Sequence, residues 1–259
     1  MSFLSASNLS RIITCPPSAF LPKEKQNFSR NAAKGTNIHA FVNRCIELGE
    51  DNARQELPAR MNGKAVIDRL QVPEILKDLS DIRSEVALRW DAENDVCYVL
   101  GENIGRNYYK AGAKDYDIVG SVDIIATNNL TGNLVVIDVK TGMQVVEAIT
   151  SEQLQALAFM VARSMGYSGS VETRISKINE DGTVDSNFHT ITPEELSILE
   201  LKFKGLRNKV LDNLNRYKTN EPLDLRESDH CKWCACAKHC PLKNAEPCLY
   251  IREDVEETK

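Results

Sequence analysis

The segment from Val119 to Gly142 constrains the fold most, because it has the pattern of a β-hairpin interrupted by charged residues. Two runs rich in Val and Ile, 119–126 and 133–140, flank a polar connection, 128–133. The Asn and Gly residues of this connection suit a tight reversal of the chain. The segment therefore predicts two antiparallel strands joined by a short turn.

The register of this hairpin decides which charged residues meet. A turn centred near residues 130–131 gives cross-strand partners whose numbers add to about 261 to 263, which sets Asp123 opposite residues 138–140. Side chains alternate between the two faces of a strand, so Asp138 and Lys140 point the same way. We therefore expect two carboxylates and one ammonium group to converge on one patch.

Three charges inside apolar strands indicate either a metal site or a solvated surface. Buried charge needs a partner or a metal. Carboxylate oxygens are hard ligands suited to Mg²⁺ or Mn²⁺, and a nearby lysine can orient or deprotonate the attacking water in phosphodiester hydrolysis. The alternative is a strand pair whose charges face water, with Asp138 and Lys140 as an ordinary surface ion pair.

Composition limits the size and the environment of the protein. The chain has 259 residues, of which 42% are hydrophobic, enough for one large domain or a domain with an appendage. It has no run of eighteen apolar residues and no layout of a secretory signal, so we expect a cytoplasmic protein without a membrane segment. The net charge of −5 predicts no overall basic field, so binding of nucleic acid has to come from local Lys and Arg patches and bound cations.

Five of the 8 cysteines lie within residues 231–248. Such clustering in a cytoplasmic chain favours metal binding over disulfides. Zinc could bind four ligands of this segment, with His239 able to replace one of the cysteines. An iron–sulfur cluster could instead bind three of these cysteines together with Cys15, which lies at the end of a helix expected over 5–17. The zinc ligands would be Cys231, Cys234, Cys240 and Cys248, and the iron–sulfur ligands would be Cys15, Cys231, Cys234 and Cys240.

Two helices carry polar residues that could reach the hairpin. A helix is predicted to begin near Thr36, and it places His39 beside its apolar stripe, where a histidine is more often a satisfied core residue than a ligand. A second amphipathic helix opens at Thr150 or Ser151. Gln153 and Gln155 near its start lie about 200° apart around the helix, so only one of them can face the site.

A strand over 84–90 and a loop over 102–117 complete the candidate residues. Glu85 could approach the carboxylates from the neighbouring strand, although a surface position is the simpler interpretation. The loop interleaves basic and aromatic residues, a pattern that suits binding of a single-stranded backbone and its bases. Its candidate DNA-binding residues are Arg106, Tyr108, Lys110 and Lys114.

Taken together, these motifs resemble those of the RecB-like branch of the PD-(D/E)XK nuclease superfamily, especially its iron–sulfur members. These members are the AddB nuclease domain and the CRISPR-associated RecB-like exonucleases, and the chain is also similar to stand-alone versions from phages and prophages. The resemblance covers nearly the whole chain. In sequence order its motifs are Cys15-Pro16, Gly35-Thr36 with His39, Gly120 with Asp123, Asp138-Val139-Lys140-Thr141-Gly142, a helix with Gln153, and Cys231/Cys234/Cys240.

The resemblance implies an α/β fold with a restriction-endonuclease-like core, in which a mixed central sheet is flanked by helices. It implies one nuclease domain over 1–259, with a cluster-bearing segment over 219–259 packed against the helix 5–17. It further implies that His39, Asp123, Asp138 and the Val139 carbonyl bind Mg²⁺ or Mn²⁺, and that Lys140 positions the attacking water. The glutamine motif departs from the family pattern, because Leu157 stands where the family has tyrosine, so the choice between Gln153 and Gln155 stays open.

The cysteine spacing implied by the resemblance favours a 4Fe-4S cluster over zinc and leaves Cys236 and Cys248 spare. The function implied is a metal-dependent DNA exonuclease of recombination or repair, acting on DNA with a free end, with a recombination or helicase protein as partner. A phage-encoded member would act in the bacterial cytoplasm. The alternatives are a DNA-end-binding protein of the same fold that does not cut, and a zinc-bearing structural or adaptor protein.

Overall fold

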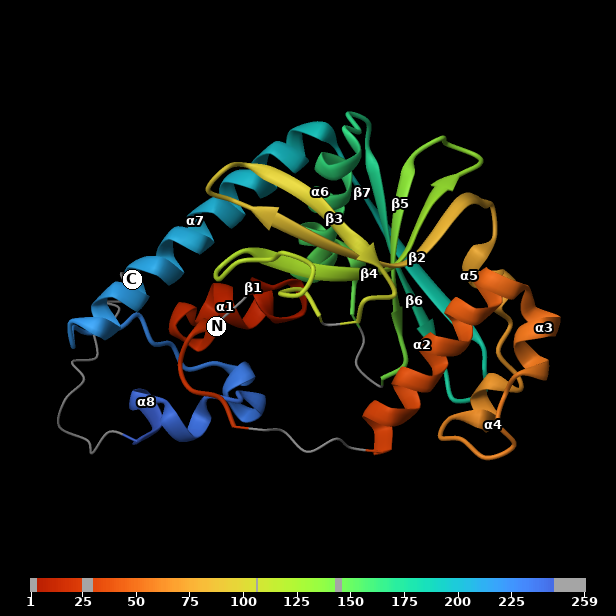
Figure 1. Cartoon of the computed structure of the whole chain (residues 1–259), viewed down its shortest axis with the longest axis horizontal. Helices are drawn as coiled ribbons and strands as arrows, with labels where there is room; N and C mark the ends of the chain where they lie inside the picture. Colours follow the sequence, from red (N-terminus) through yellow and green to blue (C-terminus); the bar gives the residue numbers. More distant parts are fainter. Residues whose placement is uncertain (1–3, 25–29, 106, 143–145, 245–259) are drawn as a thin grey trace, which may run out of the picture.

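A computed structural model describes residues 4–24, 30–105, 107–142 and 146–244 of the chain (Figure 1). The strands are β1 (Leu4–Ser5), β2 (Leu79–Asp91), β3 (Val96–Glu102), β4 (Ile118–Asn128), β5 (Leu134–Lys140), β6 (Val171–Ile178) and β7 (Val184–Ile191). The α-helices are α1 (Leu9–Thr14), α2 (Arg30–Leu48), α3 (Glu50–Gln55), α4 (Lys64–Ile67), α5 (Val72–Leu76), α6 (Glu152–Met165), α7 (Pro193–Lys218) and α8 (Pro241–Asn244). Short 3-10 helices are η1 (Ala6–Asn8), η2 (Pro16–Ala19), η3 (Ala148–Thr150), η4 (Asp229–Trp233) and η5 (Ala237–His239).

The strands of the described residues form one mixed sheet with the order β3-β2-β4-β5-β6-β7. Most neighbouring strands are antiparallel, but β5 and β6 are parallel and α6 makes the connection between them. The short β1 pairs in parallel with the start of β4. This arrangement confirms the predicted α/β class with a mixed central sheet flanked by helices (Figure 1).

The predicted hairpin and its register are confirmed. Ile124 pairs with Ile137 and Thr127 pairs with Leu134, so the numbers of each pair add to 261. The turn is closed by Asn128, whose side-chain oxygen accepts a hydrogen bond from the Leu130 N–H at 2.9 Å. The asparagine therefore fixes the reversal locally.

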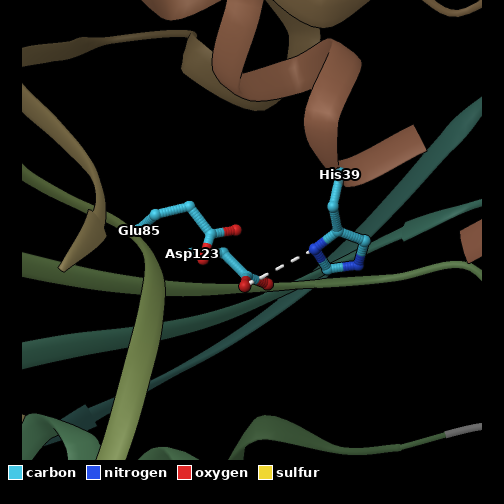
Figure 2. Close-up of side chains that lie close together, drawn as sticks. All are labelled: His39, Glu85 and Asp123. Carbon is cyan, nitrogen blue, oxygen red and sulfur yellow. Dashed lines mark ion pairs between the residues drawn. The ribbon is translucent and has the colours of Figure 1, made fainter. Parts of the chain in front are cut away.

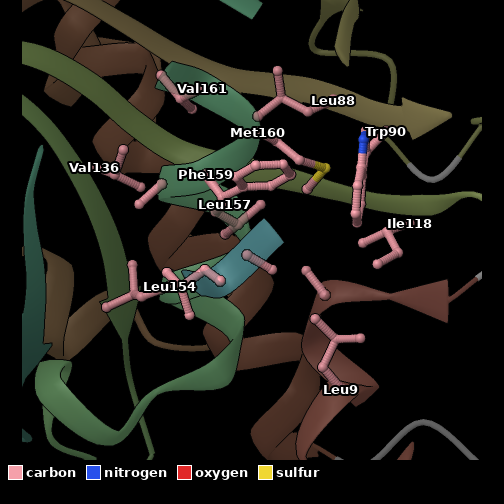
Figure 3. Close-up of a cluster of buried hydrophobic side chains, with 14 of the residues drawn as sticks. Leu9, Leu88, Trp90, Ile118, Val136, Leu154, Leu157, Phe159, Met160 and Val161 are labelled. Atoms are coloured by element: carbon pink, nitrogen blue, oxygen red, sulfur yellow. The ribbon is translucent and has the colours of Figure 1, made fainter. Parts of the chain in front are cut away.

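Two apolar clusters cover the sheet from opposite sides. The larger one joins α6, α7 and the N-terminal segment to the sheet, and its centre holds Trp90 against Phe159 with ring centroids 4.8 Å apart (Figure 3). The second joins α2, α4 and α5 to β4 and β5. Because both faces of β5 are buried, this strand has the continuous apolar sequence of a central strand.

Three sequence-based boundaries were wrong. Helix α2 begins at Arg30, six residues before the predicted start near Thr36, because the stretch before Thr36 contains good helix formers such as Ala33. Strand β2 begins at Leu79, five residues before the predicted strand. The N-terminal helix is shorter than predicted, because α1 ends at Thr14 and the two prolines that follow start a 3-10 turn.

Gly120 is predicted to be intolerant of a side chain. A Cβ atom at this buried position would lie 2.7 Å from Leu157 Cδ2 and 2.9 Å from the Ala6 Cβ. Overpacking of this kind costs about 1–3 kcal/mol, so Gly120→Ala is expected to lower the free energy of unfolding by that amount in urea denaturation.

Gly205 supplies the matched control, because it lies exposed in α7 and a Cβ atom there would meet nothing within 4 Å. Gly205→Ala is expected to raise the free energy of unfolding by up to about 1 kcal/mol through helix propensity. Equal effects of the two substitutions would show that the close packing at Gly120 does not matter.

Candidate active site

Three side chains from separate elements meet at the centre of the sheet. His39 of α2, Glu85 of β2 and Asp123 of β4 each offer a ligand atom, and these atoms all lie within 4.8 Å of one another (Figure 2). The His39 Nδ1 atom is 3.5 Å from Asp123 Oδ1. All three side chains are partly buried, so they form a polar group at the edge of the apolar core.

Helix α2 holds its polar residues against the sheet by a close approach at Gly35. A Cβ atom at Gly35 would lie 2.8 Å from the Thr141 hydroxyl oxygen, so the absence of a side chain lets the helix approach the end of β5. The buried face of the helix, which includes Ile38 and Val42, then places His39 toward the carboxylates. One turn further, Asn43 Nδ2 donates to Glu85 Oε1 at 3.1 Å.

The regular strand geometry of β4 and of β2 is interrupted at the site. Val122 packs in the cluster under α6, whereas Ile124 packs in the cluster under α2, although residues two apart in a regular strand share a face. Glu85 has a positive φ of 49°. Such a backbone conformation costs about 1–3 kcal/mol in a non-glycine residue and is concentrated at functional sites. The strained backbone therefore supports a functional role for Glu85.

Asp138 and Lys140 lie beside this group, as the register predicted. Lys140 Nζ is 2.6 Å from Asp138 Oδ2. Gln153 of α6 bridges the pair, because its oxygen accepts from Lys140 Nζ at 3.2 Å and its Nε2 donates to Asp138 Oδ1 at 3.3 Å. The backbone N–H of Val139 donates to Asp123 Oδ2 at 2.7 Å and joins the two halves of the site.

The buried surroundings of the site raise the pKa of two of its carboxyl groups. Burial raises the pKa of Asp138 to about 6, with Lys140 opposing this shift and Asp123 adding to it. Burial also raises the pKa of Glu85, opposed by the hydrogen bond from Asn43. Burial disfavours protonation of His39, but the hydrogen bond and charge of Asp123 outweigh this effect and raise the pKa of the imidazole. Concentrated negative charge of this kind favours a bound cation.

The donor set fits a hard divalent cation. Carboxylate oxygens with one imidazole are suitable ligands for Mg²⁺ or Mn²⁺. Asp138 Oδ2 is buried and, among the described residues, forms no hydrogen bond of good geometry despite its ion pair with Lys140. A buried carboxylate oxygen with spare capacity to accept is available as a ligand for a cation.

The other predicted residues lie at different distances from this site. Gln155 donates to the Ile149 carbonyl and accepts from Lys202, so Gln153 is the glutamine that reaches Asp138 and Lys140. The Tyr108 hydroxyl is 3.5 Å from Ser121 Oγ, and Ser121 precedes Asp123 by two positions on β4. Lys110 and Lys114 are exposed, and Arg106 lies outside the described residues.

Glu85 is more central to the site than its sequence pattern indicates, and no sequence signal pointed to Asn43. Glu85 interrupts a strand, and that signal is also given by any surface glutamate. Asn43 stands four residues after His39, so both fall on one face of a helix. Knowing that His39 faced the carboxylates would have indicated Asn43 as well.

A second polar site is a cavity between the N-terminal segment and the C-terminal segment. Cys15, Cys231, Cys234 and Cys240 line it together, and each is partly buried. The segments are tied by a hydrogen bond from the Glu24 N–H to the Ala235 carbonyl at 2.9 Å. The fifth cysteine of the described residues in this region, Cys236, is buried and its thiol donates to the carbonyls of Ser18 and Leu21.

The cysteine set fits a metal centre held by four thiolates. His39 and the carboxylates are not part of this cavity, and His239 is exposed and is not among its lining residues. Cys248, which the zinc alternative uses, lies outside the described residues. Cys236 and His230 also line the cavity. Because the Cys236 thiol donates to two carbonyls, four other thiols remain, and four is the ligand number of both tetrahedral zinc and iron–sulfur clusters.

The sequence of the chain matches a known family. The model of the PD-(D/E)XK nuclease superfamily matches residues 3–241. The chain therefore belongs to the PD-(D/E)XK nuclease superfamily, whose members use divalent metal ions, and the restriction-endonuclease-like core expected from its motifs is confirmed.

Two solved structures are similar to the chain over most of its length. The protein SSO0001 has 18% sequence identity and a TM-score of 0.42, over 94% of this chain and 88% of its own. A "Putative exonuclease" from Eubacterium rectale has 12% identity and a TM-score of 0.48, over 97% of this chain and 91% of its own. Both TM-scores are below 0.5, so neither similarity adds to the family assignment. No curated protein matches the chain.

Among the described residues, no helix has both the length and the apolar character needed to cross a membrane.

The raised pKa of Asp138 predicts a pH-dependent cost to stability. An aspartate in an unfolded chain titrates near about 3.9, whereas Asp138 in the fold titrates at about 6. Between these values the folded state holds a proton that the unfolded state has lost, so stability falls as pH rises. The asparagine of Asp138→Asn cannot ionise. The free energy of unfolding of this variant is therefore expected to exceed that of the wild type by about 2–3 kcal/mol at about pH 8, and the difference is expected to vanish toward about pH 4.

Urea unfolding in EDTA at several pH values measures this difference between the two proteins. A stability difference that stays constant over the pH range would contradict the assignment of the raised pKa to Asp138. Loss of DNA cleavage in the more stable Asp138→Asn variant would show that the protein keeps an ionisable Asp138 for function, although it lowers stability.

Proposed function

We propose that the protein is a Mg²⁺- or Mn²⁺-dependent deoxyribonuclease that acts on DNA ends. The observation that carries the proposal is the meeting of His39, Glu85 and Asp123 beside the linked group of Asp138, Lys140 and Gln153. These residues supply both a cation site and an ammonium group at the same place. An exonuclease in DNA recombination or repair, with a helicase or recombination partner, is supported by the motif resemblance to the RecB-like branch.

In this proposal His39, Glu85, Asp123, Asp138 and the Val139 carbonyl hold the cation. When bound, the cation neutralises the scissile phosphate and lowers the pKa of the attacking water. Asp123 is held in place by the Val139 N–H. Lys140 orients the attacking water, and Gln153 fixes both the lysine and Asp138 through its two hydrogen bonds.

The 103–117 loop is proposed to guide the DNA strand. Tyr108 lies near Ser121, on the strand that carries Asp123, while Lys110 and Lys114 are exposed on the same loop. Tyr108 is buried among Ala113 and Val119, so it supports the loop and does not stack on a base. Contact of the two exposed lysines with phosphates suits a single strand.

Cleavage of end-labelled DNA tests the nuclease function. Linear and circular DNA, each single- and double-stranded, are incubated with anaerobically purified protein in Mn²⁺, Mg²⁺ or EDTA. We expect metal-dependent loss of linear DNA only, and no cleavage by Asp123→Asn. Survival of every substrate while DNA still binds would indicate a DNA-end-binding protein that does not cut, and cleavage of circles would indicate an endonuclease.

We also propose that Cys15, Cys231, Cys234 and Cys240 bind a 4Fe-4S cluster that joins the segment 219–259 to the N-terminal helices within one domain over 1–259. Their shared cavity supports this ligand set. Iron and sulfide analysis with absorbance at about 400 nm tests it, because thiolate-ligated iron is coloured. A colourless protein with one zinc ion would instead support the structural zinc alternative.

A further inference from the structure

One cation reaches into the cysteine-lined cavity from α1. The Arg11 Nη1 atom lies 4.0 Å from Cys234 Sγ, at the limit of a hydrogen bond to sulfur, and donates to the Ser18 carbonyl at 2.8 Å. Cys236 donates to the same carbonyl, so Arg11 is anchored at the point where the two segments join. The guanidinium group is therefore held beside the thiols by a second, independent contact.

A backbone N–H group also points at a cysteine sulfur of the cavity. The Ser228 N–H donates to Cys231 Sγ at 3.4 Å. Together with Arg11 at Cys234, the cavity thus presents donors to two of its sulfurs, an arrangement that favours thiolates.

Arg11 differs from the other cations of the cavity. Arg226 and Lys243 also line it, together with the acidic Glu227. The Lys243 ammonium contacts the Cys231 carbonyl oxygen, not a sulfur. Among the described residues that line the cavity, Arg11 is the cation whose side-chain nitrogen lies within hydrogen-bond distance of a cysteine sulfur.

We infer that Arg11 is a positioning residue that sets the reduction potential of the iron–sulfur cluster through Cys234. The inference rests on the cluster proposed above. A positive charge and hydrogen bonds at the sulfurs stabilise the more negative, reduced state, so they raise the potential of a cluster. Arg11 supplies both from one guanidinium group that the Ser18 carbonyl keeps in place.

The test is an anaerobic redox titration of the full-length protein with dithionite and mediators, followed by electron paramagnetic resonance. Arg11→Met keeps an apolar stem but removes the charge. It is expected to lower the ratio of reduced to oxidised cluster about tenfold at the wild-type midpoint, equivalent to about 59 mV for one electron. Arg11→Lys keeps the charge without the planar fork and is expected to shift the potential less, in the same direction.

Lys238→Met is the matched control, because this exposed lysine lies in the same segment and pairs with Glu24 at 2.9 Å. Its potential is expected to equal that of the wild type. A wild-type potential in Arg11→Met would overturn the inference while leaving the cluster established. If Arg11→Met does not fold, an unchanged potential in Arg11→Lys would overturn the proposed hydrogen bond to Cys234. Zinc without iron in the wild type would overturn the cluster proposal, and this inference with it.

Discussion

Lys140→Ala is expected to reduce the single-turnover rate of DNA cleavage by about 10²- to 10⁴-fold, the range for loss of a group that assists proton transfer. The ammonium group lies 2.6 Å from Asp138 Oδ2 and is only partly exposed, so it can act on a water at the carboxylates. Gln153 holds it from the other side. Rapid-quench measurements in Mn²⁺ at saturating enzyme report the cleavage step itself.

Lys202→Ala is the matched control for this substitution. Lys202 bonds the other glutamine of α6, Gln155, in the way that Lys140 bonds Gln153, but away from the carboxylates. Its rate is expected to stay within about twofold of the wild type, as for a surface side chain outside the chemistry. A Lys140→Ala protein that cleaves at the wild-type rate would remove Lys140 from the mechanism, provided that its unfolding curve is unchanged.

Cys15→Ser is expected to lose the metal centre and to destabilise the protein by about 2–5 kcal/mol, by analogy with removal of a native disulfide, which also joins distant segments. Cys15 is the only N-terminal ligand in the proposed set, so without it the proposed ligands are three thiols from one segment. Metal analysis and thermal unfolding measure the two effects. Cleavage is expected to weaken too, because Ala6 of the same segment packs on Gly120, three residues before Asp123.

Cys236→Ser tests whether Cys236 binds the metal or has only a structural role. Cys236 lies in the same segment but is buried and donates to two carbonyls, a role that a serine hydroxyl can keep. This variant is expected to retain its metal. Loss of metal from Cys236→Ser with retention in Cys15→Ser would reverse the proposed ligand set.

Local patterns predicted the elements that depend on neighbouring residues. A cap of this local kind opens α7, because Thr192 and Glu195 satisfy each other's backbone N–H groups within one turn. The turn residues of the β4–β5 hairpin fixed its register, and that register alone placed Asp123 near Asp138 and Lys140.

The sequence by itself therefore determined the sheet class, the hairpin and the pairing of its charged residues. The motif resemblance pointed to His39. Only the tertiary structure decided that α2 brings Asn43 to the site with it, that Glu85 joins them at a strained φ, and that Gln153 faces Asp138. Alternation and helical period are properties of single elements, and they carry no information on which distant element packs alongside. That choice follows from side-chain packing across the core, such as the contact of α2 with β5 that the missing side chain of Gly35 allows.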